Sequence, residues 1–345
     1  MLMDFFHKYL SIWVLACMVV GVALGATVPA VPESLSSLTV SGISIPIAVL
    51  IWIMIYPMMI KVDFNSVRQV GKKPAGLILT WIINWLVKPF TMYAITAFFL
   101  FTVFSSLIPQ EIASEYLAGA VLLGAAPCTA MVFVWSSLVK GNPAYTVVQV
   151  ATNDLIILVA FVPIVTFLLG VTDVDVPYNV LVMSIVLFVV IPLVAGVVTR
   201  ALVIRNKGED FLNETFLPSF DGITTIGLLA TLVIIFSTQA DTILAHPLHI
   251  VLIAVPLIIQ TVFIFALAYG LARAIRLPFD IAAPAGMIGA SNFFELSVAV
   301  AVALFGVGSA AALATTVGVL TEVPVMLALV AVANKTKGWF PHVHS

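Results

Sequence analysis

The sequence has little charge and few cysteines for its length. Only 9% of its 345 residues are charged, whereas a soluble domain carries about 25%. This shortage excludes an ordinary water-soluble domain, and a formal net charge of -2 gives no indication of nucleic-acid binding. The two cysteines, Cys17 and Cys128, lie in separate apolar runs about 110 positions apart, so a structural disulfide is not expected.

The sequence also lacks the motifs of several enzyme classes. It has no Gly-rich phosphate loop, so ATP-driven pumping by this chain alone is not expected. No His, Cys, Asp or Glu cluster has metal-ligand spacing, so no resident metal or other cofactor is predicted. An intramembrane enzyme with Cys128 as nucleophile would need a positioned base, and no histidine is expected at membrane depth, because all five lie at span ends or in the tails. We therefore do not expect an enzyme.

What the sequence has instead is long uncharged runs from one end to the other. A helix needs about 20 apolar residues to cross the hydrocarbon core of a membrane. The run after Lys8 could imitate a signal peptide, but the charge pattern described below requires it as the first span. The ten predicted spans are 11–28, 43–60, 77–104, 117–139, 144–169, 179–199, 222–238, 248–272, 281–305 and 310–333.

The charged residues between the spans predict an orientation. With the N-terminus in the cytoplasm, thirteen of the fourteen basic residues fall on the cytoplasmic side, and Lys88 lies within a span. The thirteen are Lys8, Lys61, Arg68, Lys72, Lys73, Lys140, Arg200, Arg205, Lys207, Arg273, Arg276, Lys335 and Lys337. The opposite loops carry only acids, namely Glu33, Glu111, Glu115, Asp173, Asp175 and Asp241. The sequence thus predicts a multi-pass protein of the cell (inner) membrane, in contact with lipid, with both termini cytoplasmic.

The loop at 170–178 divides the ten spans into five and five. Because five is odd, the second half must insert upside down relative to the first, an architecture common in secondary transporters. We therefore predict an all-α membrane protein made of two inverted five-helix repeats, residues 1–170 and 171–345, which together form one transporter domain.

The fourth span of each half contains residues that disrupt a helix. Span 4 reads Gly-Ala-Ala-Pro-Cys-Thr-Ala-Met from Gly124, and span 9 reads Gly-Ala-Ser-Asn-Phe-Phe-Glu-Leu from Gly289. Pro127 removes a backbone donor, while Ser291 and Asn292 compete with the backbone for hydrogen bonds. We predict that both helices are broken and cross near the midplane, at one shared site. The alternative is two kinked helices with no site.

Four ionisable residues lie inside spans, where each costs about 2.5–3.5 kcal/mol or more and so needs a partner, a cavity or a function. They are Lys88, Asp154, Glu295 and Glu322. Glu295 follows the break in span 9, where desolvation favours the protonated carboxyl and allows proton exchange near neutral pH. The alternative is a carboxyl that stays protonated and only hydrogen-bonds a neighbouring helix.

The other candidates each leave two interpretations open. Cys128 is either a ligand or a small buried hydrophobe, and if a half-helix starts at Pro127 the helix dipole favours its thiolate while burial opposes it. Lys88 either pairs with a carboxylate or lines the cavity. Asp154, next to Asn153, and Glu322 are the fifth-span acids of the two halves, and they either carry ions or join the repeats by hydrogen bonds.

Several of these segments together resemble the arsenite efflux permeases of the arsenical-resistance-3 family, within the bile acid:sodium symporter superfamily. The resemblance runs from Tyr9 to Asn334. The segments that carry it are Ser44–Ala48 with Tyr56-Pro57, Asn84–Phe90, Ala126–Val132 (which includes Thr129), Asn153-Asp154, Gly289–Glu295 and Gly318–Pro324.

The resemblance implies the fold predicted above and a substrate, arsenite, with antimonite as a second cargo. It also implies that Cys128 and Glu295 are required and that protons are exchanged for the cargo. A thiolate suits trivalent arsenic, which is soft, and a single thiol would bind weakly enough to release it. The rival interpretations are a sodium-coupled symporter of organic anions with the same fold, and a passive channel.

Overall fold

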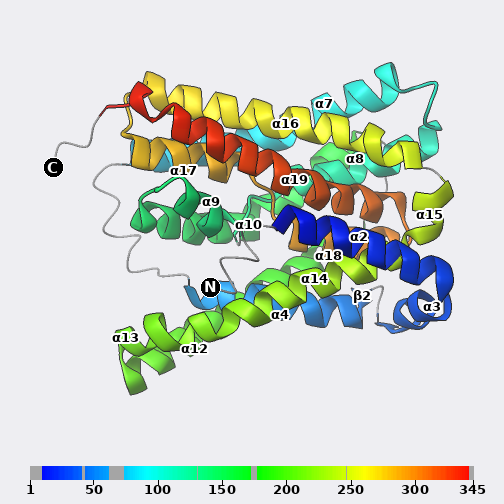
Figure 1. The fold of residues 1–345 in the computed structure, drawn as a ribbon, viewed down its shortest axis with the longest axis horizontal. Helices are drawn as coiled ribbons and strands as arrows, with labels where there is room; N and C mark the ends of the chain where they lie inside the picture. The colour runs from blue at the N-terminus through cyan, green and yellow to red at the C-terminus, as the bar shows by residue number, and fades with distance from the viewer. Residues whose placement is uncertain are drawn as a thin grey trace.

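The computed structural model describes residues 10–40, 43–61, 74–129, 131–171, 177–245 and 247–341. This part of the chain is helical except for β1 (Thr39–Val40) and β2 (Ile43–Ser44), which form a short antiparallel pair. The helices lie side by side along the long axis of the molecule (Figure 1). The predicted all-helical class is therefore confirmed.

In the first half of the chain, helices cover the five predicted apolar runs. They are α2 (Leu10–Thr27), α3 (Ala30–Ser37), α4 (Ile45–Lys61), α6 (Ala75–Ile82), the π-helical turn η1 (Ile83–Val87), α7 (Lys88–Phe98), the π-helical turn η2 (Phe99–Val103), α8 (Gln110–Ala125), α9 (Val132–Leu138) and α10 (Pro143–Gly170).

The second half repeats this pattern of long apolar helices with one interrupted pair. Its elements are α11 (Tyr178–Ile185), the π-helical turn η3 (Val186–Val190), α12 (Ile191–Lys207), α13 (Glu209–Phe211), the π-helical turn η4 (Leu212–Phe216), the 3-10 turn η5 (Pro218–Phe220), α14 (Asp221–Thr238), α15 (Ala240–Ala245), α16 (Pro247–Ala274), α17 (Phe279–Ala290), α18 (Phe294–Phe305), α19 (Ala310–Lys335) and the 3-10 turn η6 (Lys337–Trp339).

Five continuous helices in the described residues are long and apolar enough to cross a membrane. They are Ala75–Val103, Pro143–Gly170, Tyr178–Lys207, Pro247–Ala274 and Ala310–Lys335. Shorter apolar helices lie in four of the remaining predicted runs, namely 11–28, 43–60, 222–238 and 281–305. Together they make this a multi-pass membrane protein.

Local sequence signals explain several helix ends. The Asn142 side chain accepts a hydrogen bond from Tyr145 N at 3.1 Å and caps α10, and Ser309 caps α19 through Ala312 N at 3.1 Å. Gly306 follows α18 with φ 93, a left-handed conformation that glycine adopts without a steric penalty. The chain therefore turns sharply between α18 and α19.

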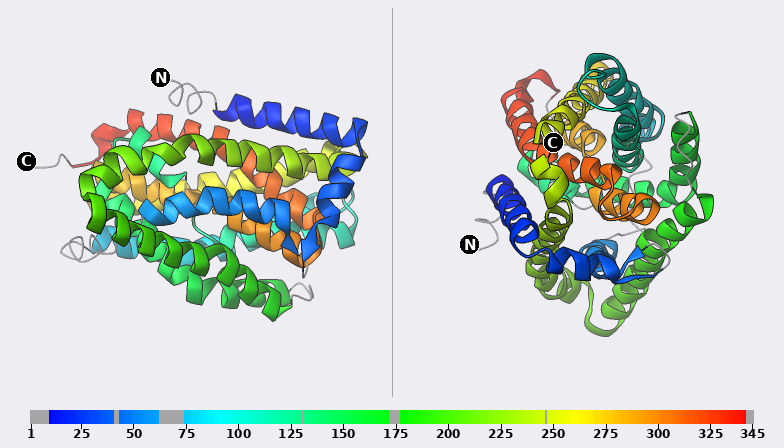
Figure 2. Two further views of the ribbon diagram at one scale, coloured as in Figure 1. Left: turned by 90° about the horizontal axis from the view of Figure 1, so that it is seen from below. Right: turned by 90° about the vertical axis from the view of Figure 1, so that its right-hand side faces the viewer.

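The helices pack as two groups. In the first group, α2 and α4 pack against α14, and α12 packs against α4. In the second, α7, α8, α16, α17, α18 and α19 pack with one another, and α10 joins α8 and α9. Figure 2 shows α2 at the outside of the molecule. It approaches α14 closely, because a Cβ on Gly21 would lie 2.7 Å from Phe236 Cβ. The two groups meet where α18 contacts α4 and where α19 contacts α2 and α14.

The charged helix ends lie at opposite ends of the molecule. At one end, Asn334 donates to Leu138 O at 3.1 Å and Asn142 N donates to Asp280 O at 2.8 Å, so several basic segments come together. At the other end, Glu115 accepts from Ala310 N at 3.0 Å. In Figure 1 the first of these ends is the one near α13, and the second is the one near α15. Lys8, Arg68, Lys72, Lys73, Asp173 and Asp175 lie outside the described residues.

Candidate functional site

The first helix break separates α8, which ends at Ala125, from α9, which begins at Val132. Ala126 is extended, with φ -118 and ψ 115, as a residue before proline prefers. Pro127 and Cys128 follow on non-helical backbone, and Cys128 is fully buried. The half-helix therefore does not start at Pro127, so the condition on which the helix-dipole interpretation of Cys128 depended is not met. Cys128 does not lie in the first turn of a helix, and a helix dipole does not explain how its thiolate would be stabilised.

The second break separates α17, which ends at Ala290, from α18, which begins at Phe294. Ser291 is extended, with φ -80 and ψ 145, so the chain leaves the helical path at once. Glu295 lies in the first turn of α18 and is 3% exposed. Both interruptions predicted from the sequence are present.

The two breaks pair with each other through their backbones. Phe293 N donates to Ala126 O at 2.9 Å, and Cys128 N donates to Ser291 O at 3.4 Å. Pro127 and Asn292 face one another as a single antiparallel bridge. Unwound backbone inside a membrane needs partners within the protein. Each break supplies them to the other, so the crossing is one structural unit.

Glu322 of α19 holds the second break in place. Its carboxylate accepts from the Ser291 hydroxyl at 2.5 Å and from Asn292 N at 3.1 Å. The Asn292 side chain donates to the same carboxylate at 3.2 Å. Of the two interpretations open for Glu322, these contacts favour hydrogen bonding. They join α19 to the neighbouring break within the second half of the chain, rather than one half to the other.

Lys88 adds a side-chain connection between the halves to the backbone pairing of the two breaks. It is fully buried, at the start of α7, directly after the π-helical turn that accommodates Pro89. Its ammonium donates to Ser291 O, the carbonyl that also accepts from Cys128 N. Lys88 also interacts electrostatically with Glu322 and with Cys128. A residue of the first half therefore binds the break of the second.

The remaining predicted residues stay outside this cluster. Asn153 accepts from Trp85 Nε1 at 3.3 Å, but its amide nitrogen has no hydrogen-bond partner among the described residues. Both carboxyl oxygens of Asp154 and the hydroxyl of Thr129 are likewise buried and without such a partner. The structure thus unites Lys88, Cys128 and Glu322 around Ser291–Asn292, and it does not place Asp154 with them.

The sequence analysis overlooked three uncharged polar residues. Three residues, Asn84, Gln149 and Gln260, are completely buried, with 0% exposure to solvent. Their side-chain amides have no hydrogen-bond partner in the described part of the chain. Buried amides normally find partners. In the sequence, each of the three is an amide side chain within a predicted apolar run. Ionisable side chains in such runs were taken as candidates, and these three amides were not.

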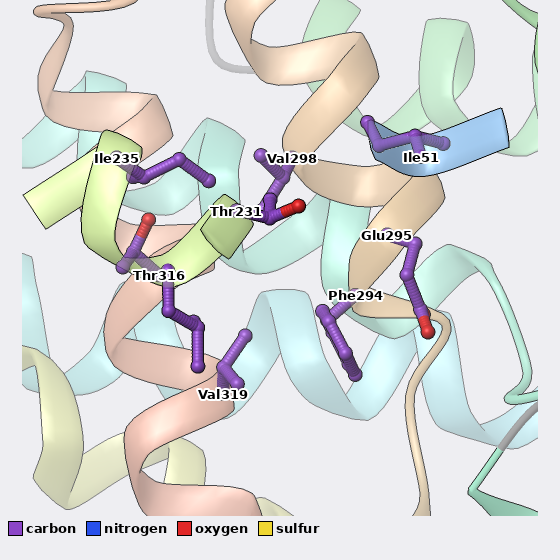
Figure 3. Close-up of a pocket in the computed structure, with 9 residues that line it drawn as sticks. Ile51, Thr231, Ile235, Phe294, Glu295, Val298, Thr316 and Val319 are labelled. Carbon is purple, nitrogen blue, oxygen red and sulfur yellow. The ribbon is translucent and has the colours of Figure 1, made fainter. Parts of the chain in front are cut away.

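A small pocket lies where the two helix groups meet (Figure 3). Glu295 and Phe294 of α18 line it together with Thr316 of α19, Thr231 of α14 and Ile51 of α4. Cys128 is not among the lining residues. One oxygen of Glu295 is buried without a hydrogen-bond partner among the described residues. The acid therefore lies at the junction of the two groups, whereas the thiol lies inside the second group.

Comparison with known proteins gives consistent matches. The model of the sodium bile acid symporter family matches residues 48–246. An arsenical-resistance protein Acr3 of Alkaliphilus metalliredigens is 61% identical over 98% of this chain and 95% of its own length. An uncharacterized transporter of Synechocystis is 45% identical over 98% of this chain and 91% of its own. An Acr3 of Corynebacterium glutamicum is 33% identical over 95% of this chain and 88% of its own. The chain therefore belongs to the sodium bile acid symporter family and, within it, to the arsenical-resistance transporters.

Proposed function

We propose that this protein exports arsenite from the cytoplasm in exchange for protons, with Cys128 as the arsenic ligand and Glu295 as the proton-exchanging group. One observation carries the proposal. The non-helical segment that contains Cys128 pairs with the segment that leads into Glu295. Soft trivalent arsenic prefers a thiolate, and two of the relatives are named arsenical-resistance proteins. Antimonite, which has the same soft chemistry, is a second expected cargo.

The position of Glu295 supports its role in coupling. Its side chain lines the pocket between the two helix groups, so any movement of one group against the other changes the surroundings of the carboxyl. Burial favours the protonated form and exposure favours the charged form. In the proposed cycle, cargo binding at Cys128 accompanies proton release from Glu295 to the cytoplasm. Movement of the groups then opens the site outward, and reprotonation resets the carrier.

The same proposal includes the arrangement in the membrane. Ten spans as two inverted repeats would place both breaks at the same depth, which is where such transporters bind their cargo. The clustering of basic helix ends at one end of the molecule supports a cytoplasmic position for both termini. The membrane is then the cell (inner) membrane.

The alternative is a sodium-coupled symporter of organic anions. The name of the matching family favours it, as do the buried oxygens of Asp154, Asn292 and Glu295 that lack partners in the described residues. A symporter of this kind gives no function to a thiol at the crossing. Sodium-dependent uptake of an organic anion into proteoliposomes, without proton-driven arsenite flux, would favour this alternative.

Arsenite uptake into everted membrane vesicles under an imposed pH gradient tests the proposal. We expect Cys128→Ser and Glu295→Gln to lose uptake to the level of vesicles without the protein. Cys17→Ser is the matched control, because Cys17 lies on α2 in the other helix group, and we expect near-normal uptake. Full uptake by Cys128→Ser would remove the thiol from the mechanism. Uptake that is unaffected by an uncoupler would remove the proton.

A further inference from the structure

The non-helical position of Cys128 raises the question of what stabilises its thiolate. The thiol is 0% exposed, so water does not solvate the charge. A buried thiolate requires compensating positive charge, and the residue does not lie at a helix N-terminus of the kind that lowers the cost in many thiol sites. The compensation must come from a neighbouring side chain or from donors in the crossing.

Lys88 is the side chain that meets this requirement. It is the one lysine or arginine that is buried among the described residues, with 0% exposure. Its ammonium and the Cys128 backbone N–H donate to the same oxygen, Ser291 O, so one carbonyl holds both the charge and the backbone of the cysteine. The charge is also within electrostatic range of Cys128.

The Lys88 ammonium has more N–H donors than its hydrogen bonds use. A lysine ammonium carries three N–H donors, and one of them goes to Ser291 O. In the part of the chain that the structure describes, no second acceptor for Lys88 is present. Glu322 interacts with Lys88 electrostatically while its own oxygens are occupied by Ser291 and Asn292. The ammonium therefore keeps donors that no hydrogen bond among the described residues uses.

We propose that Lys88 is a positioning residue for Cys128, whose ammonium, fixed on the Ser291 carbonyl, stabilises the thiolate. The thiolate is the form that binds metals and reacts with electrophiles. The stabilised thiolate would serve to bind a soft metalloid, and in this respect alone the inference rests on the proposed function. Of the acids buried in the surrounding helices, Asp154 on α10 makes no hydrogen bond to the crossing, and Glu295 on α18 and Glu322 on α19 do not favour a negative thiolate. Lys88 is the buried cation that favours it.

The test measures the reactivity of Cys128 without arsenite, so its failure is separate from failure of transport. In a Cys17→Ser background, Cys128 is the sole cysteine. The purified, folded protein is treated with N-ethylmaleimide over a range of pH, and the midpoint of the rate profile is recorded. We expect Lys88→Met to raise the midpoint by about one pH unit or more, and Lys88→Arg, which keeps the charge, to leave it near that of the background.

Two further variants make the result decisive. Asp154→Asn changes another fully buried charge that does not bond the crossing, so the midpoint should stay unchanged. Glu322→Gln removes the acid that balances Lys88, so the midpoint should fall, and this variant decides the matter if Lys88→Met does not fold. A midpoint that is the same in the background, Lys88→Met and Glu322→Gln would overturn the proposal. A shift in Asp154→Asn equal to that in Lys88→Met would also overturn it, because the effect would not be specific to Lys88.

Discussion

The two helix breaks meet at one crossing, yet they are held in different ways. The second break, at Ser291–Phe293, is fixed from outside by side chains, because Glu322 accepts three of its donors and Lys88 binds its carbonyl. The first break, at Ala126–Thr129, bonds the second through its backbone, while the Thr129 hydroxyl has no partner in the described chain. The comparison indicates that the second break is a rigid support and that the first, which carries Cys128, depends on it.

The fifth-span acids differ in the same sense. Glu322 occupies the last long helix of the second half and is satisfied by the break beside it. Asp154 occupies the last long helix of the first half, is fully buried, and has no hydrogen-bond partner among the described residues. An acid that is buried without partners is costly and marks a functional position in membrane proteins.

Removal of Glu322 should damage the protein most. Glu322→Ala leaves the ammonium of Lys88 unbalanced and the donors of Ser291 and Asn292 unsatisfied. A buried donor left without its acceptor costs about 1–3 kcal/mol, and three donors lose theirs here, so we expect a large fall in the unfolding midpoint in detergent. The second break would not be the rigid support described above if Glu322→Ala unfolded at the same temperature as the parent protein.

A matched pair of hydroxyl deletions compares the breaks directly. Ser291→Ala removes a hydroxyl that donates to Glu322, and Thr129→Val removes one that has no partner in the described residues. Loss of a buried hydrogen bond costs about 1–3 kcal/mol. We expect this loss for Ser291→Ala and little or none for Thr129→Val, measured by thermal unfolding of the two purified variants. Equal losses would show that the first break is held as firmly as the second.

The smallest effect on stability is expected for Asp154→Asn. The change removes an ionisable group from a buried position and breaks no hydrogen bond in the described structure. We therefore expect the unfolding midpoint to stay the same or to rise, in contrast to Glu322→Ala. A fall as large as that of Glu322→Ala would mean that Asp154 has a structural partner, and the contrast between the two acids would be lost.

The positions of the two helix breaks could be predicted from the sequence, but the contacts that hold the breaks could not. Pro127 and the Ser291-Asn292 pair are local signals, and both interruptions are present. The late start of α9 at Val132 could not be predicted from them, because the extended path past Cys128 is fixed by pairing with residues 291–293, far along the chain. The partners of Glu322 and Lys88 are likewise contacts between distant segments, so a list of buried charges gives the candidates but not their pairing.

The central claim is that Cys128 binds arsenic at the crossing, and protection of its thiol tests this most directly. The folded Cys17→Ser protein is treated with N-ethylmaleimide with and without arsenite, and phosphate serves as the control oxyanion. We predict that arsenite slows modification of Cys128 and that phosphate does not. A rate of modification that is unchanged at saturating arsenite would contradict the account, whatever the flux measurements show.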